Sequence, residues 1–469
     1  MARIDRSKLL AEYADVHLGD ARIDERLQRI LPQLATAPSD SFPEQMESDA
    51  DQEALYRFLG NPKVTLDGLL EGHRLQTLGR MSGRGLVRVV HDTTQFQFEG
   101  EREGLGVLQG DEKGFLAHFA LAVVSDETRE PLGILGVRPF VNTLKHRGLT
   151  ASQRTKNTLL APRSEKRSSR WEMLALDVSR SLPDGVEAIH LMDQEADDYG
   201  VFAALCEASL RFVIRSKPRR ITADKMRTNE VLARKPAQIF RSVPISARSK
   251  KQARRKHHPA RAARIAELSV RASTITLSRP VSSPHAPLVE LTLNAVHVFE
   301  LSPPPGEDAI EWMLFTTEPI DTRQEVDAVV DHYRARWVTE EYFKALKTGC
   351  AFEKRQLCSF DGLVRALGLF VPMAWTLLAL RTLGRETTDR PATDVFTDSQ
   401  LRLLRALLEK RRRHLAVAPT IRDAMLGIAG LGGHIKNNGD PGWLVLGRGL
   451  RRFTEAEEGW NLHERSDQS

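Results

Sequence analysis

Two aspartates close short β-branched runs that are typical of buried strands. Asp92 ends the run at 86–92, and Asp193 ends the run at 186–193. Active sites commonly form at strand ends along the open edge of an α/β sheet. Two carboxylates placed there can share hard cations such as Mg²⁺, which prefers carboxylate, water and phosphate oxygens. An aspartate after a strand is, taken alone, more often a turn residue or a helix cap than a catalytic group, so the interpretation depends on the residues that accompany these two.

A third carboxylate lies on a helix predicted over 323–347. One stripe of this helix carries a phenol, three cations and a carboxylate: Tyr333, Arg336, Glu340, Lys344 and Lys347. At about 100° per residue, these five positions fall within roughly 80° of one another. Glu340 can then join the two aspartates as a metal ligand while the cations hold phosphates. The alternative is a solvated face with a Glu340–Lys344 pair at i,i+4, but it leaves Tyr333 and Arg336 unexplained.

The elements that must position these residues appear as periodic runs. Strand-like runs interleaved with helical ones favour an α/β sheet. The N-terminal region is predicted to be helical, with apolar residues at helical spacing between positions 23 and 34. The predicted strands, in addition to the two above, are 115–124 and 131–140 as a hairpin, 211–215, 288–299 and 312–317; the predicted helices are 51–59, 171–182, 199–208, 362–382, 400–413 and 419–430. A basic, polar connection covers 145–170, and a second basic stretch covers 248–264.

The composition sets broad limits on the class of protein. A chain of 469 residues is long enough for two or three domains. The net charge of +6, from 68 Lys and Arg against 62 Asp and Glu, permits a polyanionic partner without establishing one. The three cysteines form no CxxC pair, which predicts a reducing, cytoplasmic location. The sequence shows no apolar run of about 18 residues, so no membrane span is predicted.

The spacing Tyr-x-x-Arg-x-x-x-Glu-x-x-x-x-x-x-Lys at 333–347 resembles the signature of the insertion-sequence-four family of transposases. Several other stretches resemble the same family in the same order. They are Leu18-Gly19-Asp20 with Arg22 and Arg26, Gln52-Glu53, Tyr56-Arg57-Phe58, Asn61-Pro62, Asp92-Thr93-Thr94, 193–197, 211–217, and Trp312 before Thr317-Glu318-Pro319. The likeness covers roughly residues 15–360. The sequence departs from the family at Gln194, where relatives often have arginine, and in the longer basic stretch 248–264.

The resemblance implies an α/β fold in which a ribonuclease-H-like catalytic domain is flanked by helical domains. The implied division is a helical DNA-end-binding domain at 1–70, a catalytic domain at 71–360 and a mostly helical C-terminal domain at 361–469. The catalytic domain would contain a β-rich insertion at about 217–320. By analogy the C-terminal domain would mediate dimerisation.

The resemblance also implies roles for individual residues. Asp92, Asp193 and Glu340 would hold two Mg²⁺ ions, for which Mn²⁺ can substitute. Tyr333, Arg336 and Lys347 would hold DNA phosphates, and Trp312 would stack on a flipped base. The remaining DNA contacts would come from Lys344 on the helical stripe, Arg215 and Lys217 on the catalytic domain, and Arg22, Arg26 and Arg57 on the N-terminal domain. Without the family, Trp312 reads as a core aromatic and these surface cations as solvated side chains.

The function expected on this basis is cut-and-paste transposition by a homodimer acting on transposon terminal repeats and target DNA. Cleavage would pass through a DNA hairpin, and strand transfer would follow. The alternatives are a metal-dependent DNA nuclease without strand transfer, and an inactive or domesticated DNA-binding protein. A carbohydrate hydrolase with paired carboxylates is a fourth interpretation, but it does not explain the cationic stripe.

Overall fold

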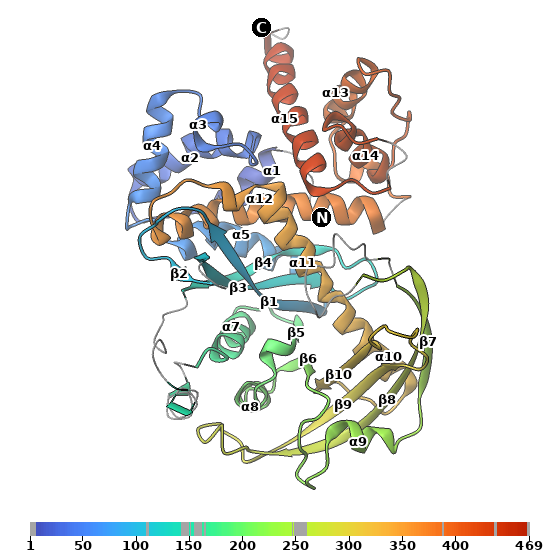
Figure 1. The fold of residues 1–469 in the computed structure, drawn as a ribbon. Helices are drawn as coiled ribbons and strands as arrows, with labels where there is room; N and C mark the ends of the chain where they lie inside the picture. Colours follow the sequence, from blue (N-terminus) through green and yellow to red (C-terminus); the bar gives the residue numbers. More distant parts are fainter. Residues whose placement is uncertain are drawn as a thin grey trace.

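One large mixed sheet with helices on both faces forms the centre of the molecule, which is described here from a computed structural model (Figure 1). The structure describes residues 6–108, 112–141, 150, 152–153, 162–163, 166–245, 247, 260–386, 389–435 and 439–466. The α/β class expected from the sequence is therefore confirmed. Most of the basic stretch 248–264 lies outside the described residues.

The sheet has the strand order β2-β3-β1-β5-β6-β10-β9-β8-β7, and β4 also pairs with β3. β1, β3 and β4 are antiparallel, whereas β5 and β6 run parallel to β1. The strands are β1 (Leu86–Phe98), β2 (Gly106–Val107), β3 (Lys113–Val124), β4 (Pro131–Phe140), β5 (Glu187–Met192), β6 (Arg211–Ser216), β7 (Ile239–Ile245), β8 (Arg264–Ser278), β9 (Glu290–Glu300) and β10 (Glu311–Thr316). The β-rich run expected at 217–320 therefore extends the same sheet through the β10–β6 pairing.

Helices cover both faces of the central strands. Figure 1 shows α5 (Leu66–Met81) and α12 (Phe360–Glu386) on one face, with α7 (Ser169–Arg180) and α8 (Tyr199–Glu207) on the other. Because both faces are covered, β3 is buried along almost its whole length. The remaining short helix of this half, α9 (Thr228–Ala233), lies beside β8.

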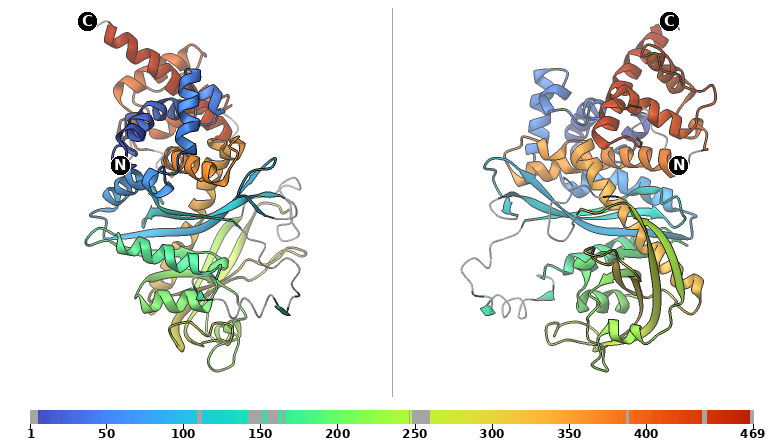
Figure 2. Two further views of the ribbon diagram at one scale, coloured as in Figure 1. Left: turned by 90° about the vertical axis from the view of Figure 1, so that its left-hand side faces the viewer. Right: turned by 45° about the vertical axis from the view of Figure 1, so that its right-hand side comes forward.

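Two groups of helices lie on the side of α12 that faces away from the parallel strands β5 and β6 (Figures 1 and 2). The N-terminal group is α1 (Arg6–Ala11), α2 (Ala21–Thr36), α3 (Phe42–Gln45) and α4 (Asp49–Gly60); the C-terminal group is α13 (Asp398–Glu409), α14 (Ile421–Leu431) and α15 (Trp443–Ser466). The apolar residues predicted to form one helix face between 23 and 34 are all buried on α2. The N-terminal group, the sheet and α12 share one continuous hydrophobic core. The boundaries at 70 and 361 remain a prediction.

Three local expectations are corrected by the structure. β1 does not end at Asp92 but continues to Phe98, because the alternation of buried and less buried side chains persists through 93–98. The helix expected over 323–347 is divided into α10 (Arg323–Ala335) and α11 (Trp337–Lys344), followed by a π-helical turn from Ala345. Within the β-rich run expected at 217–320, β7 and β8 are strands that were not among those predicted from the sequence.

The long apolar helix α12 meets the length and hydropathy expected of a membrane span over 360–385. However, 83% of its most apolar window is buried inside the protein. Burial of this kind is typical of a core helix, and α12 contacts α4, α5, β4 and α14.

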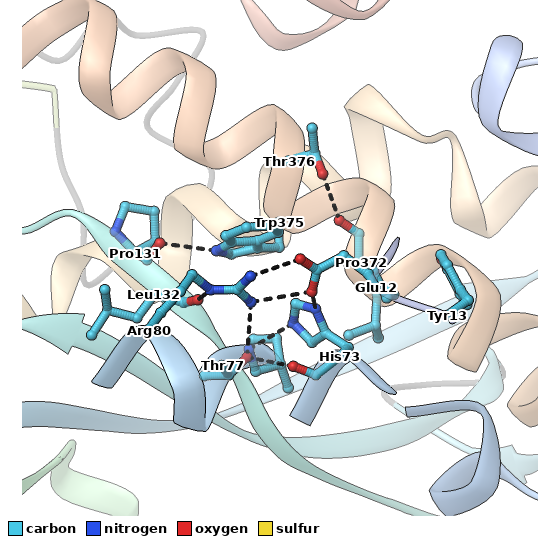
Figure 3. Close-up of polar contacts among 12 residues, drawn as sticks. Glu12, Tyr13, His73, Thr77, Arg80, Pro131, Leu132, Pro372, Trp375 and Thr376 are labelled. Carbon is cyan, nitrogen blue, oxygen red and sulfur yellow. Dashed lines mark hydrogen bonds and ion pairs between the residues drawn. The ribbon is translucent and has the colours of Figure 1, made fainter. Parts of the chain in front are cut away.

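A buried polar cluster joins the N-terminal segment to the sheet and to α12 (Figure 3). The Arg80 guanidinium contacts both carboxylate oxygens of Glu12, at 2.7 and 3.1 Å, and lies 4.2 Å from the ring centre of Trp375 on α12. His73 contacts Glu12 through Nδ1 at 2.5 Å, and its Nε2 accepts from the Ile134 N–H of β4. Since Nε2 is an acceptor, His73 is the neutral tautomer with its hydrogen on Nδ1. One ion pair and one neutral imidazole thus connect three parts of the chain.

Candidate active site

Asp92 and Asp193 lie side by side on neighbouring parallel strands. The register of β1 and β5 pairs His91 with Met192, and the residue that follows each of these is an aspartate, Asp92 or Asp193. Neighbouring strands are about 4.8 Å apart, so the two carboxylates reach the same region. Asp92 Oδ1 accepts from the Thr93 N–H at 2.8 Å, and Asp193 Oδ1 accepts from the Glu195 N–H at 2.8 Å. Both aspartates are therefore held by the backbone that follows them.

Arg336 brings Glu340 into this group. Its Nη1 donates to Asp92 Oδ2 at 2.7 Å, and its Nη2 donates to Glu340 Oε1 at 2.9 Å. Arg336 stands between α10 and α11. Its backbone N–H donates to the Tyr333 carbonyl, and the Thr339 N–H donates to the Arg336 carbonyl. These i→i+3 bonds tighten the helix locally and explain why the predicted single helix is divided. One guanidinium thus links the sheet aspartate to the helix glutamate.

The electrostatics of the site are those of crowded carboxylates. Burial raises the pKa of Asp92 to about 7, and the negative charge of Asp193 adds to the rise while Arg336 opposes it. Burial also raises the pKa of Asp193, against the opposing charges of Arg336 and Arg170. Groups in this state gain from any additional positive charge placed among them.

Arg170 is a second cation at this site that the sequence did not indicate. Its Nη2 donates to Glu195 at 2.8 Å and its Nε to the Thr93 hydroxyl at 3.3 Å, so one side chain contacts the segments after both aspartates. The sequence places Arg170 at the end of a basic connection, where it is one cation among several. Only the start of α7, packed against the sheet, distinguishes it from the others.

The structure separates the predicted helical stripe into two parts. Tyr333 is buried against Trp312 of β10, with ring centres 5.4 Å apart, and Lys347 Nζ donates to the Gln95 carbonyl of β1. Tyr333, Arg336 and Lys347 therefore all contact elements around the carboxylates. Lys344 instead pairs with Glu341 at 2.6 Å and lies over the exposed ring of Trp337.

The other predicted DNA contacts lie outside the carboxylate group. On β6, Arg215 faces Leu314 of β10 and donates to the Glu311 carbonyl at 3.3 Å, and the Lys217 side chain beyond it is exposed. The three N-terminal arginines, Arg22, Arg26 and Arg57, are on α2 and α4, on the opposite side of α12 from β5 and β6 (Figures 1 and 2). Arg22 pairs with Asp20 and Arg57 with Glu53.

The donor set fits a hard divalent cation. Asp92, Asp193 and Glu340 offer only carboxylate oxygens, which Mg²⁺ and Mn²⁺ accept. In the described part of the chain, no three Asp, Glu, His or Cys side chains are drawn together closely enough to hold one ion. The positive charge between Asp92 and Glu340 is supplied by Arg336.

Comparison with known proteins agrees with this reading of the chain. Residues 6–64 match the family described as Transposase DNA-binding, and residues 158–376 match the Transposase DDE domain. The second match includes Asp193 and Glu340 and begins after Asp92. Together the two matches support a transposase of the DDE class, in which a DNA-binding domain precedes the catalytic one.

One solved structure in the comparison is a "piggyBac transposase synaptic complex with hairpin DNA". The likeness has a TM-score of 0.36 and 8% sequence identity, and it covers 95% of this chain and 77% of the other. A similarity at this level does not establish a common fold.

Proposed function

We propose that this protein is a cut-and-paste DNA transposase of the insertion-sequence-four family, with Asp92, Asp193 and Glu340 as its catalytic carboxylates. The observation that carries the proposal is the meeting of two aspartates from adjacent parallel strands with a glutamate from a covering helix, through Arg336. The strand order β4-β3-β1-β5-β6, with three antiparallel strands followed by two parallel ones, supports the ribonuclease-H-like layout that the family resemblance implies.

Asp92, Asp193 and Glu340 would hold two Mg²⁺ ions, which would activate the attacking oxygen and stabilise the leaving one in phosphodiester chemistry. The chain's own contribution is charge and position. Arg336 can grip a phosphate through two N–H groups, and Lys347 adds a point charge in the π-helical turn that follows α11. The buried Tyr333 ring packs against the Trp312 ring and would hold it in position. Held in this way, a scissile phosphate meets the carboxylates in a defined orientation.

The remaining residues are assigned to holding DNA away from the reacting phosphate. Arg215 and Lys217 at the end of β6 would contact the transposon end, and Lys344 would contact it from α11. Arg22, Arg26 and Arg57 would recognise the terminal repeat within the DNA-binding region 6–64. Two copies of the chain would bring two ends together, acting in the cytoplasm.

The proposed reaction has four stages. Hydrolysis frees a 3′ hydroxyl at the transposon end. This hydroxyl attacks a phosphodiester of the opposite strand, which forms a hairpin and releases the flanking DNA with its own 3′ hydroxyl. Water then hydrolyses the hairpin, and the regenerated 3′ hydroxyl attacks a phosphodiester of target DNA and displaces a 3′ oxygen of the target strand.

The direct test uses the full chain and DNA bearing the terminal repeats that flank its own gene, with and without Mg²⁺. Cuts at the repeat ends and joining to a second DNA should require Mg²⁺ and disappear in Glu340→Ala. Sequencing gels resolve the cut positions, and a labelled plasmid reports joining. Cutting without joining would identify a nuclease, and tight end binding without cutting under Mg²⁺ or Mn²⁺ would identify an inactive DNA-binding protein.

Trp312→Ala is expected to reduce hairpin formation while first-strand nicking continues. Stacking of one base on an aromatic ring is worth about 1–3 kcal/mol, which corresponds to a loss of roughly five- to 150-fold in hairpin yield per unit time. Denaturing gels separate nicked from hairpin DNA. The matched variant Trp312→Phe keeps a ring against Tyr333 and should retain most of the hairpin step. Equal losses of nicking and hairpin formation would show that Trp312 serves only the packing around Tyr333.

A further inference from the structure

Arg336 occupies two of the carboxylate oxygens to which the proposed metal ions would bind. Its guanidinium holds Asp92 Oδ2 at 2.7 Å and Glu340 Oε1 at 2.9 Å, and the other oxygen of Asp92 accepts from the Thr93 N–H. Both oxygens of Asp92 are therefore engaged by the protein itself. The Arg336 side chain is only 14% exposed, so the contact is shielded from solvent. A divalent cation bound to Asp92 and Glu340 would compete with the guanidinium for these carboxylate oxygens, and the two positive charges repel each other.

We propose that Arg336 acts as a latch: in the DNA-free protein it closes the carboxylate site, and a phosphate of bound DNA withdraws it so that a divalent cation can enter. The latch rests on the proposed function, because it assigns metal binding to Asp92 and Glu340. Beyond the proposed function, the latch implies that the DNA end binds before the metal and that the Arg336 side chain determines this order.

A phosphate is a competent competitor for this guanidinium. Arginine binds phosphate and carboxylate with the same two-pronged geometry, so the contact is exchanged and not simply lost. Arg336 stands at the junction of α10 and α11, and its guanidinium lies 5.9 Å from the centre of the Tyr333 ring, a contact that does not involve the carboxylates. Its departure does not leave the aspartates without a cation, since Arg170 remains beside Asp193.

The latch makes metal binding and DNA binding favour each other. By linkage, DNA that tightens metal binding must itself be bound more tightly in the presence of metal. A free chain in a cell would therefore carry little metal at this site and would be protected from hydrolysing DNA that it does not hold correctly.

The test is the affinity of the full, DNA-free chain for Mn²⁺, measured by calorimetry and by the electron paramagnetic resonance signal of free Mn²⁺. Arg336→Gln should bind Mn²⁺ about tenfold or more tightly than the wild type, because an uncharged amide no longer competes for the carboxylates. The matched control is Arg334→Gln, which removes an exposed arginine of the same helix that pairs with Asp331. This control should leave the Mn²⁺ affinity unchanged. The site itself is defined as the binding that is lost in Asp193→Asn.

Addition of duplex DNA carrying the terminal repeat gives a second measurement. The DNA should tighten Mn²⁺ binding to the wild type, which needs no variant of Arg336, and it should have a much smaller effect on Arg336→Gln. Saturable Mn²⁺ binding with equal affinity in wild type and Arg336→Gln would overturn the latch and leave the proposed function standing. Absence of any Mn²⁺ site sensitive to Asp193→Asn, with or without DNA, would overturn both.

Should Arg336→Gln fail to fold, as judged by circular dichroism, Arg336→Lys replaces it. The lysine ammonium is a point charge that cannot hold Asp92 and Glu340 with two parallel N–H groups. It should therefore bind Mn²⁺ more tightly than the wild type, and an affinity equal to or weaker than the wild type would contradict the latch.

Discussion

Asp92→Asn is expected to lower the rate of DNA cleavage by about 10³-fold or more, because it removes several kcal/mol of charge stabilisation at the reacting phosphate. End binding should change little, since the DNA-binding region lies at 6–64 and Asn keeps the size of the side chain. Gel-shift titration and a cleavage time course on the same DNA separate the two effects. A parallel loss of end binding would argue that Asp92 maintains the DNA-binding surface and is not a ligand.

The same substitution should stabilise the metal-free fold at high pH. The folded-state pKa of Asp92, about 7, lies above its usual value of 3.8, so the folded chain binds this proton more tightly than the unfolded chain. The free energy of unfolding of the wild type therefore falls as pH rises through this window, by about 4 kcal/mol in all, and the loss is complete above pH 7. Asparagine does not ionise and escapes this loss.

Urea denaturation in the presence of a chelator measures this effect at about pH 4.5 and about pH 8, near the two ends of the window. The stability of Asp92→Asn relative to the wild type should increase between them. A relative stability that instead decreases would show that the Asp92–Arg336 ion pair outweighs the burial of the carboxylate.

The parts of the site that could be predicted from sequence are those set by local pattern. Asp92 and Asp193 each follow a β-branched run, and parallel pairing of those runs brings the two aspartates level. Glu340 came from helical spacing and from the family resemblance. The prediction that Asp92 ends its strand was wrong, since polar Thr93 and Gln95 on an exposed or half-buried face do not stop a strand whose other face stays buried.

The parts that could not be predicted depend on contacts between distant residues or on departures from ideal geometry. Arg336 meets Asp92 across 244 positions in the chain, and no local signal specifies that partner. The predicted stripe assumed one straight α-helix, but the helix tightens at Arg336, before Lys344, and widens into a π-turn at Ala345–Gly349, which contains Lys347. The angular range of the stripe, calculated for one straight helix, therefore does not apply after these two changes. Arg170 lacked any periodic signal that separates it from neighbouring cations.

The N-terminal group also shows what local pattern misses. Local pattern predicts α2 and α4 but not the attachment of the group, which depends on Glu12, His73 and Arg80 from three separate stretches. The cluster joins the segment that enters α2 to the sheet that carries Asp92. Residues 6–64, which match the Transposase DNA-binding family, and the carboxylates proposed as catalytic are thus parts of one packed body, as the proposed function requires of a chain that binds and cuts one DNA end.

Arg80→Met is expected to destabilise the fold by about 3–5 kcal/mol, because the buried Glu12 carboxylate loses the cation that pairs with it and keeps its contact with the neutral His73 ring. Glu12 is only 5% exposed, and Arg80 supplies both of its arginine contacts. Arg138→Met is the matched control: its ion pair with Asp177 at 2.9 Å is about half exposed and should contribute less than about 1 kcal/mol. Urea denaturation of both variants gives the comparison.

The double variant Glu12→Gln/Arg80→Met decides whether the loss comes from the stranded charge. An uncharged amide at position 12 removes the buried carboxylate, so the double variant should be more stable than Arg80→Met alone. Limited proteolysis should then show early cleavage near residues 12–20 in Arg80→Met and much less in the double variant. If both variants unfold alike, the stability contributed by Arg80 comes from its contact with the Trp375 ring and the Leu132 carbonyl, and the ion pair is secondary.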